Sequence, residues 1–297
     1  MQEGHIHPIS SLIREANQIF YAMGFTCAEG PLLESEHYNF DMLNFPKDHP
    51  ARDMQDTFFV KDRPGYVLRT HTSPVQVRYM EAQMKKGTMP PYRVIVPGKV
   101  FRNEATDMTH EAEFFQIEGL AVGEDITLAH LKGTLAKFLE EIMSASARGG
   151  PASGGKGNQG SASGGKATNV EIRFRPSFFP FVEPGVEVDM RVTGKDAPAK
   201  TSPGTGSSPL SVSPGEPKAL ADASLSDAFR EKFRDKWIEM MGAGMVHPNV
   251  LKNAGVDPAK YQGFAFGMGL DRLALLRWGI DDIRLMHSAD LRFVNQF

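Results

Sequence analysis

The chain has 297 residues, of which 41% are hydrophobic, so it can bury a substantial core. Its 33 basic and 36 acidic residues leave a formal net charge of −3, which excludes coating nucleic acid by a general positive excess. Cys27 is the only cysteine, which excludes an internal disulfide and a cysteine-based zinc site. The sequence has no secretory signal and no apolar run near the ~18 residues of a membrane helix, so we expect a soluble, cytoplasmic protein.

The predicted elements begin with an amphipathic helix. Apolar residues recur at helical spacing from Ile9 to Phe20, and Pro8 suits the first turn. The stretches YRVIVPGKVF (92–101) and FFQIEGLAV (114–122) predict strands because they are rich in β-branched and aromatic residues. A second helix is predicted between Leu128 and Ile142.

The second half of the chain adds more strands and one more strong helix. Residues 170–192 have a strand-like composition broken by prolines, and the last strong helix begins near Leu270. Strands clustered in the middle with helices at both ends predict an α+β fold, with an antiparallel sheet flanked by helices.

Two stretches of low complexity interrupt these elements. Residues 144–168 carry almost no apolar side chains, and residues 194–227 are rich in Pro, Ser, Ala and Gly. Such segments cannot offset the entropy of ordering by burial, so we predict two flexible insertions. Because each interrupts residues that we assign to one site, we predict a single domain over residues 1–297.

The stretch FRNEATDMTHEAEFFQIEG (101–119) places ionised groups beside aromatic rings. We predict a hairpin of residues 100–104 and 113–120, in which Arg102 and Glu104 share one strand face. The return strand would contribute a ring, an amide and a second carboxylate: Phe114, Gln116 and Glu118. Such a floor suits a nucleotide, and a solvated hairpin with surface ion pairs remains the alternative.

The second motif is GFAFGMGLDRLALLRWG (263–279). Its glycines let the backbone pass close to a neighbouring group, and Arg272 falls in the first turn of the following helix, where an anion is favoured. A dinucleotide-binding fingerprint is excluded because Arg272 occupies the third glycine position. A tight packing turn remains the alternative.

These two stretches resemble motifs 2 and 3 of the class II aminoacyl-tRNA synthetases, and the opening helix is similar to motif 1. Four further stretches resemble the bacterial phenylalanyl-tRNA synthetase alpha-subunit family: RTHTSPVQVRYM, RFRPSFFPFVEPGVEVD, GMVHPNVL and DLRFVNQF. The resemblance runs from about residue 5 to residue 297, apart from the two insertions. Family members usually begin with a long helical arm that contacts tRNA. This sequence starts almost at motif 1, so we expect it to lack that arm.

The resemblance implies a class II catalytic domain that attaches phenylalanine to tRNA(Phe) through phenylalanyl-adenylate, with ATP as substrate and Mg²⁺ as cofactor. The partner would be a beta subunit, in a heterotetramer of two alpha and two beta subunits. A ligase for another amino acid, or a catalytically silent paralogue acting as an RNA-binding or regulatory module, are the alternatives. Retention of the phosphate-binding residues argues against a silent paralogue.

The family pattern also implies roles for individual residues. Arg102 would bind the α-phosphate through the transition state, Arg272 the γ-phosphate, and Glu104 would lie near the reacting centre. His110 would assist on the phosphates, Phe114 would stack on adenine, and Glu183 would bind Mg²⁺ together with the partner subunit. The implied phenylalanine site comprises His71, Ser73, Gln76, Gln116, Glu118, Phe179, Phe181, Val182, Ala265 and Gly267.

An apolar slot rejects an added hydroxyl by only about a hundredfold. In the family, editing lies on the beta subunit, so we expect accuracy against tyrosine to depend on that partner.

Overall fold

The computed structural model of the chain describes residues 4–52, 56–108, 110–144, 169–193, 236–280 and 282–297. Of the two predicted insertions, residues 145–168 and 194–227 lie outside the described part of the chain. Ser144, the first residue of the first predicted insertion, is the last residue of a helix.

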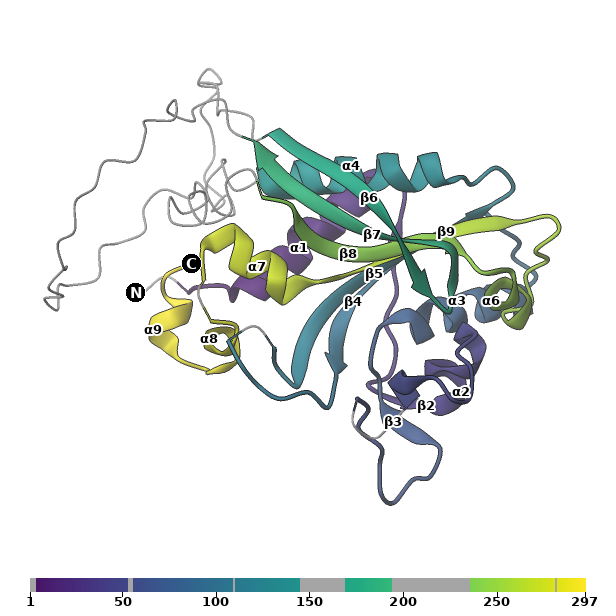
Figure 1. Cartoon of the computed structure of the whole chain (residues 1–297), viewed down its shortest axis with the longest axis horizontal. Coiled ribbons are helices and arrows are strands. Elements are labelled where there is room, and N and C mark those ends of the chain that lie inside the picture. The colour runs from purple at the N-terminus through teal and green to yellow at the C-terminus, as the bar shows by residue number, and fades with distance from the viewer. Residues whose placement is uncertain (1–3, 53–55, 109, 145–168, 194–235, 281) are drawn as a thin grey trace, which may run out of the picture.

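A seven-stranded sheet in the order β1-β4-β5-β9-β8-β7-β6 forms the centre of the described structure (Figure 1). Only β1 and β4 pair in parallel, and the other neighbours are antiparallel. This arrangement confirms the predicted α+β fold with an antiparallel sheet. The strands are β1 (Thr26–Cys27), β4 (Tyr92–Phe101), β5 (Glu113–Gly123), β6 (Asn169–Phe179), β7 (Val182–Thr193), β8 (Ile238–Val246) and β9 (Gln262–Gly269).

Helices cover both faces of the sheet. One face packs against α1 (Pro8–Ala22), α4 (Leu128–Ser144) and α7 (Leu270–Trp278), with α8 (Arg284–His287) and α9 (Leu291–Val294) beside them. The other face carries a smaller layer that includes a two-stranded β2–β3 pair. Its elements are β2 (Leu33–Ser35), α2 (Glu36–Asn39), two short 3₁₀ helices (Asp41–Leu43 and Pro50–Arg52), β3 (Tyr66–Leu68), α3 (Ser73–Lys85) and α6 (Pro248–Asn253).

Alternation along the central strands decides which residues face each layer. On β5, Ile117 and Ala121 pack into the core beneath α1 and α4, whereas Leu120 and Val122 pack toward α3 and α6. Gln116 and Glu118 have the same parity as Leu120, so these polar side chains point into the layer of α3. The buried carboxyl group of Glu118 therefore lies on the side of the sheet that carries α3 and α6.

The predicted strand over residues 100–104 is wrong in its last three residues. Strand β4 ends at Phe101, and Arg102 and Glu104 lie in the following loop. The Arg102 N–H still donates to the Ala112 carbonyl at 3.0 Å, but the Asn103 N–H donates to the Asp56 carbonyl at 3.2 Å. This second bond turns the chain away from β5, so Arg102 and Glu104 do not share a strand face.

Replacing Gly119 or Gly133 with alanine should have opposite effects on the free energy of unfolding. A Cβ at Gly119 would overlap the ring of Phe266, which is buried and stacked on Phe20 with 5.4 Å between centroids, so it cannot swing away. We expect Gly119→Ala to lower the free energy of unfolding by about 1–3 kcal/mol. At Gly133, inside α4, a Cβ meets nothing within 4 Å, and alanine should stabilise by about 1 kcal/mol. Chemical denaturation of both variants measures the difference, and equal effects would contradict the assignment of Gly119 to a filled core.

Candidate functional site

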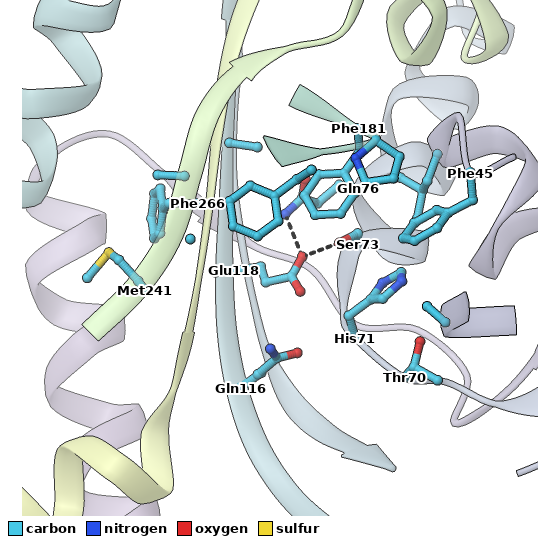
Figure 2. A pocket seen from close by; sticks show the side chains of 18 of the residues that line it. Phe45, Thr70, His71, Ser73, Gln76, Gln116, Glu118, Phe181, Met241 and Phe266 are labelled. Carbon is cyan, nitrogen blue, oxygen red and sulfur yellow. Dashed lines mark hydrogen bonds between the residues drawn. The ribbon is translucent and has the colours of Figure 1, made fainter. Parts of the chain in front are cut away.

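A cavity of about 540 Å³ opens on the sheet face that carries α3 (Figure 2). Its walls come from β5, β8, β9, the loop before α3 and the turn between β6 and β7. The structure brings eleven of the predicted site residues to its lining: His71, Ser73, Gln76, Arg102, Glu104, Gln116, Glu118, Phe179, Phe181, Ala265 and Gly267. These residues come from four separate parts of the sequence.

Glu118 provides the buried negative charge of the cavity, with only 5% of its surface exposed. It accepts hydrogen bonds from the Ser73 hydroxyl at 2.6 Å, the Thr72 N–H at 3.1 Å and the Gln76 amide at 3.2 Å. These donors surround the N-terminus of α3, where unpaired N–H groups favour an anion. Burial nevertheless raises the pKa of Glu118 to about 7. The carboxyl group is therefore poised to ionise fully when a cation arrives.

Glycine at position 267 is what lets Glu118 occupy this place. The two residues face each other across the β5–β9 ladder. A Cβ on Gly267 would lie 3.0 Å from the Glu118 Cγ, tighter than ordinary side-chain contacts. A larger residue would therefore displace the carboxylate.

Three neighbouring polar groups have no hydrogen-bond partner within the described residues. Both ring nitrogens of His71, the Thr72 hydroxyl and the Gln116 side-chain oxygen are buried without one. A buried polar group without a partner is costly, so such a cluster indicates that a polar ligand completes it. The His71 ring stacks on Phe45 at 5.9 Å, and its pKa is lowered to about 3 by burial and then by Arg102 and Arg69. His71 is therefore neutral, so one of its ring nitrogens can donate a hydrogen bond and the other can accept one.

Aromatic rings form the apolar end of the cavity. Phe179 and Phe181 stack at 5.8 Å, and Phe45 lies 5.8 Å from Phe181. Ala265 adds only a methyl group to this wall, which leaves room for a ligand ring. A Cβ on Gly242 would lie 2.9 Å from the Phe179 ring, so this glycine also shapes the compartment.

Sequence reasoning missed several lining residues, namely Phe45, Met241, Gly242 and Phe266. Phe45 lies in an irregular segment after a 3₁₀ helix, and no motif or periodicity marks it. Val182, which was predicted for the wall, is buried between β6 and β8 and is not part of the lining.

The phosphate-binding part of the predicted site is only partly assembled around the cavity. Arg102 lines it, lies over the Phe114 ring at 5.1 Å and is 3.9 Å from the Glu104 carboxylate. Phe114 lies on the same face of β5 as Gln116 but outside the lining. Arg272 is also outside the lining, and its Nη1 donates to the backbone oxygen of Glu239, a residue that lines the cavity, at 3.2 Å. Arg102 therefore reaches the cavity directly, whereas Arg272 contacts the backbone of a lining residue from outside it.

His110 and Glu183 lie outside the cavity lining. The His110 ring contacts the Asp107 carboxylate at 3.1 Å in the exposed loop between β4 and β5. Glu183 is 75% exposed at its side chain and lies 3.3 Å from the His247 ring. In the part of the chain that the structure describes, no group of three or more His, Cys, Asp or Glu side chains could hold a metal ion.

The neutrality of His71 predicts a specific sensitivity to acid. Its pKa of about 3 in the fold is below the ordinary 6.5, so its contribution to stability is complete above pH 6.5 and is lost as the pH falls toward 3. Protonation of this one histidine in the unfolded chain changes the free energy of unfolding by at most about 1.4 kcal/mol per pH unit. We expect His71→Phe, which keeps a ring beside Phe45, to flatten this loss between about pH 6 and about pH 4. Urea denaturation at stepped pH measures it, and parallel curves for both proteins would contradict the assignment.

Comparisons with known proteins identify the family of the chain. A family model described as the tRNA synthetases class II core domain (F) matches residues 1–151 and 164–297. Three similar proteins, each 43% identical, are named phenylalanine–tRNA ligase alpha subunit. The one from Dehalococcoides mccartyi strain CBDB1 aligns over 99% of this chain and 70% of its own length. Those from Anoxybacillus flavithermus and Bacillus subtilis align over 100% and 99% of this chain, and over 70% and 69% of their own lengths. None of the helices among the described residues is long and apolar enough to cross a membrane.

Proposed function

The chain belongs to the phenylalanine–tRNA ligase alpha subunits, a family of class II aminoacyl-tRNA synthetases, and from this premise we propose how its cavity works. Its function is the ATP-dependent attachment of phenylalanine to tRNA(Phe), as the catalytic alpha subunit that acts with a beta subunit. The comparisons give no support to a catalytically silent RNA-binding module. The observation that carries the proposed mechanism is the cavity itself, which is lined by a buried, hydrogen-bonded carboxylate, a group of aromatic rings and an arginine.

Phenylalanine fits the two compartments by its own chemistry. Its ammonium would pair with Glu118, and its carboxylate would accept a hydrogen bond from the one N–H that neutral His71 carries. Its ring would enter the aromatic compartment, where edge-on contacts with Phe179 and Phe181 are favourable and Ala265 leaves space. The full proposed set for the amino acid keeps Ser73, Gln76, Gln116, Val182 and Gly267 as supporting residues.

The first reaction step joins this substrate to ATP. A carboxylate oxygen of phenylalanine attacks the α-phosphorus, the bond to the bridging oxygen of the β-phosphate breaks, and pyrophosphate leaves. An anion must approach an anion, so fixed cations supply most of the catalysis. Arg102 would hold the α-phosphate and Arg272 the γ-phosphate, assisted by His110, with Phe114 on adenine and Glu104 near the reacting centre. A ribose hydroxyl of tRNA then attacks the acyl carbonyl and gives up its proton, the bond between the acyl carbon and the phosphate oxygen breaks, and AMP leaves.

We propose that Mg²⁺ is bound mainly by the phosphates of ATP. Such ions take one or two protein carboxylates and complete their octahedron with phosphate oxygens and water. Glu183 fits that limited demand, since its carboxylate is exposed and paired only with the His247 ring among the contacts described. When bound, the metal would neutralise charge on the leaving pyrophosphate. We also propose a cytoplasmic heterotetramer of two alpha and two beta subunits, in which the partner completes the metal site, and a single catalytic domain over residues 1–297.

The direct test is ATP–pyrophosphate exchange driven by phenylalanine. The chain, co-expressed with the beta subunit of its own source, should exchange label only when phenylalanine is present. Exchange driven best by another amino acid would change the substrate assignment. No exchange with any amino acid, by a folded complex, would refute catalysis by this chain.

Fidelity should depend on the partner. The aromatic compartment rejects a hydroxyl by about a hundredfold at most, so tyrosine should be activated at that level. We expect mischarged tyrosyl-tRNA to accumulate when the beta subunit carries an inactivated editing site and to disappear with the intact subunit. Equal tyrosine accuracy in both complexes would contradict this expectation.

A further inference from the structure

A single carboxylate joins the strand of motif 2 to the helix of motif 3. Asp271, the second residue of α7, is 1% exposed, and its Oδ2 accepts a hydrogen bond from the Phe115 N–H at 2.6 Å. The ladder between β5 and β9 ends at Gln116 and Gly269. Asp271 therefore supplies the acceptor that the next residue of β5 needs where the partner strand has become a helix.

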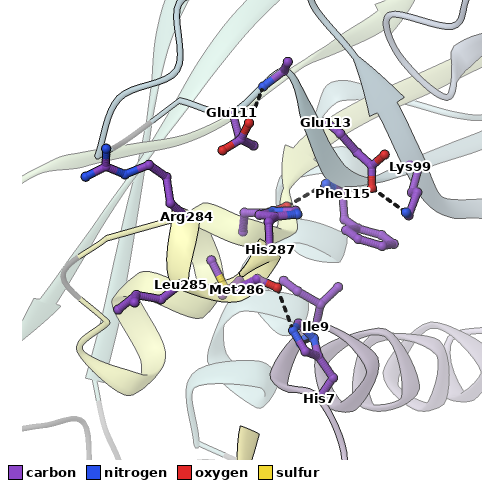
Figure 3. A network of polar contacts seen from close by, with 12 residues as sticks. His7, Ile9, Lys99, Glu111, Glu113, Phe115, Arg284, Leu285, Met286 and His287 are labelled. Carbon is purple, nitrogen blue, oxygen red and sulfur yellow. Dashed lines mark hydrogen bonds and ion pairs between the residues drawn. The ribbon is translucent and has the colours of Figure 1, made fainter. Parts of the chain in front are cut away.

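His287 holds this carboxylate from the other side. Its Nε2 lies 2.8 Å from the Asp271 Oδ1, and its side chain is only 18% exposed (Figure 3). The segment that carries His287 is itself anchored at two points. His7 bonds the Met286 carbonyl at 2.9 Å, and the Ile283 N–H donates to the Met108 carbonyl in the β4–β5 loop at 3.0 Å. The short helix α8 thus supports the junction between the two motifs.

The residues on either side of this junction are the ones that the proposed mechanism assigns to ATP. Phe114 directly precedes Phe115, and Arg272 directly follows Asp271. We propose that His287 is a positioning residue for ATP: by orienting Asp271, it fixes the spacing between Phe114 and Arg272. The inference rests on the proposed function, since it deepens the account of the same nucleotide site.

The charges around His287 favour its protonated form. The hydrogen bond to Asp271 raises its pKa above the usual value, and Glu111 and Glu113 act in the same direction, whereas burial opposes them. The contact is therefore complete below the usual histidine pKa and weakens as the pH rises through the raised value. The remaining charged or titratable neighbours drawn around it are Lys99, which pairs with Glu113, Arg284, which pairs with Asp282, and His7.

Two substitutions of His287 separate positioning from packing. His287→Phe keeps a ring but removes the donor, and should raise KM for ATP in pyrophosphate exchange by about 10-fold while KM for phenylalanine stays unchanged. His287→Gln keeps a neutral N–H donor but not the charge, so it should bring KM for ATP only part of the way back to the original value. In the original enzyme KM for ATP should rise at alkaline pH, and both variants should lose that dependence. His130→Phe, an exposed histidine of α4, is the matched control.

The outcomes are distinct. An unchanged KM for ATP in His287→Phe overturns the inference, and so does an equal rise in both KM values, which indicates general loosening. Should His287→Phe fail to fold, Asp271→Asn keeps the shape and an acceptor for Phe115, and the same selective rise is expected. Failure of the original complex to exchange at all would refute the proposed function, whereas normal exchange with insensitive variants refutes only the role of His287.

Discussion

Replacing Arg102 with alanine should lower kcat for phenylalanyl-adenylate formation by about 100- to 1000-fold, the usual cost of removing one group that stabilises developing charge. The guanidinium lines the cavity proposed for phenylalanine and lies over the ring of Phe114, which is proposed for adenine, so it contacts both parts of the proposed site. Negative charge on the α-phosphate grows as the substrate carboxylate attacks, and a fixed cation stabilises it most in the transition state. Single-turnover formation of adenylate measures the effect.

Two further variants decide whether the loss belongs to this position. Arg102→Lys keeps the charge but loses the two-pronged hydrogen bonding of guanidinium, so it should recover only part of the rate. Arg292→Ala removes an arginine whose side chain is 91% exposed and pairs with Asp290, and it should have the original rate. A fall in kcat below about 10-fold for Arg102→Ala would remove this residue from the catalytic role.

The fold was largely predictable because the strong patterns survive in the structure. Apolar spacing located α1, α4 and α7, and the β-branched and aromatic runs located β4 and β5. Strand β1, only two residues long, pairs with β4 in parallel, an exception to the antiparallel prediction. The end of β4 was missed because the bond from Asn103 to the Asp56 carbonyl is a long-range contact, which no local pattern encodes.

The residues that line the cavity were largely predictable, and their geometry was less so. Motif resemblance selected residues from four distant segments, and most of them meet at one cavity. Phe45 was not predicted as a lining residue because it contributes only a ring and lies within an irregular segment. The hydrogen bond by which Asp271 joins α7 to β5 was not predicted either. A carboxylate beside an arginine in the first turn of a helix is typical of many solvated helices, so the sequence does not mark this residue.

Replacing Glu118 with glutamine should raise KM for phenylalanine by about 100-fold or more, the cost of losing one partner of a buried charge pair, while KM for ATP stays unchanged. Glutamine keeps the volume and can still accept the Thr72 N–H bond, but its NH2 group replaces the oxygen that accepts from Ser73 and Gln76, so the charge and those two acceptor contacts are lost together. The original enzyme should bind phenylalanine better as the pH rises through about 7, where Glu118 ionises, and the variant should lack this rise. Steady-state exchange across pH measures both effects.

The stability of Glu118→Gln relative to the original protein should rise with pH although its binding of phenylalanine is weaker. This combination separates a binding role of Glu118 from damage to the fold. Because the pKa of Glu118 is raised to about 7 from the ordinary 4.5, its contribution to stability is complete below pH 4.5 and is lost as the pH rises through 7. Glutamine does not titrate, so Glu118→Gln should become more stable relative to the original protein over this window. A variant that is both less stable at pH 8 and weaker in binding phenylalanine would show that Glu118 supports the fold. A variant that is more stable and weaker in binding would identify a carboxylate kept ionised in a buried site at the expense of stability, because the substrate requires it.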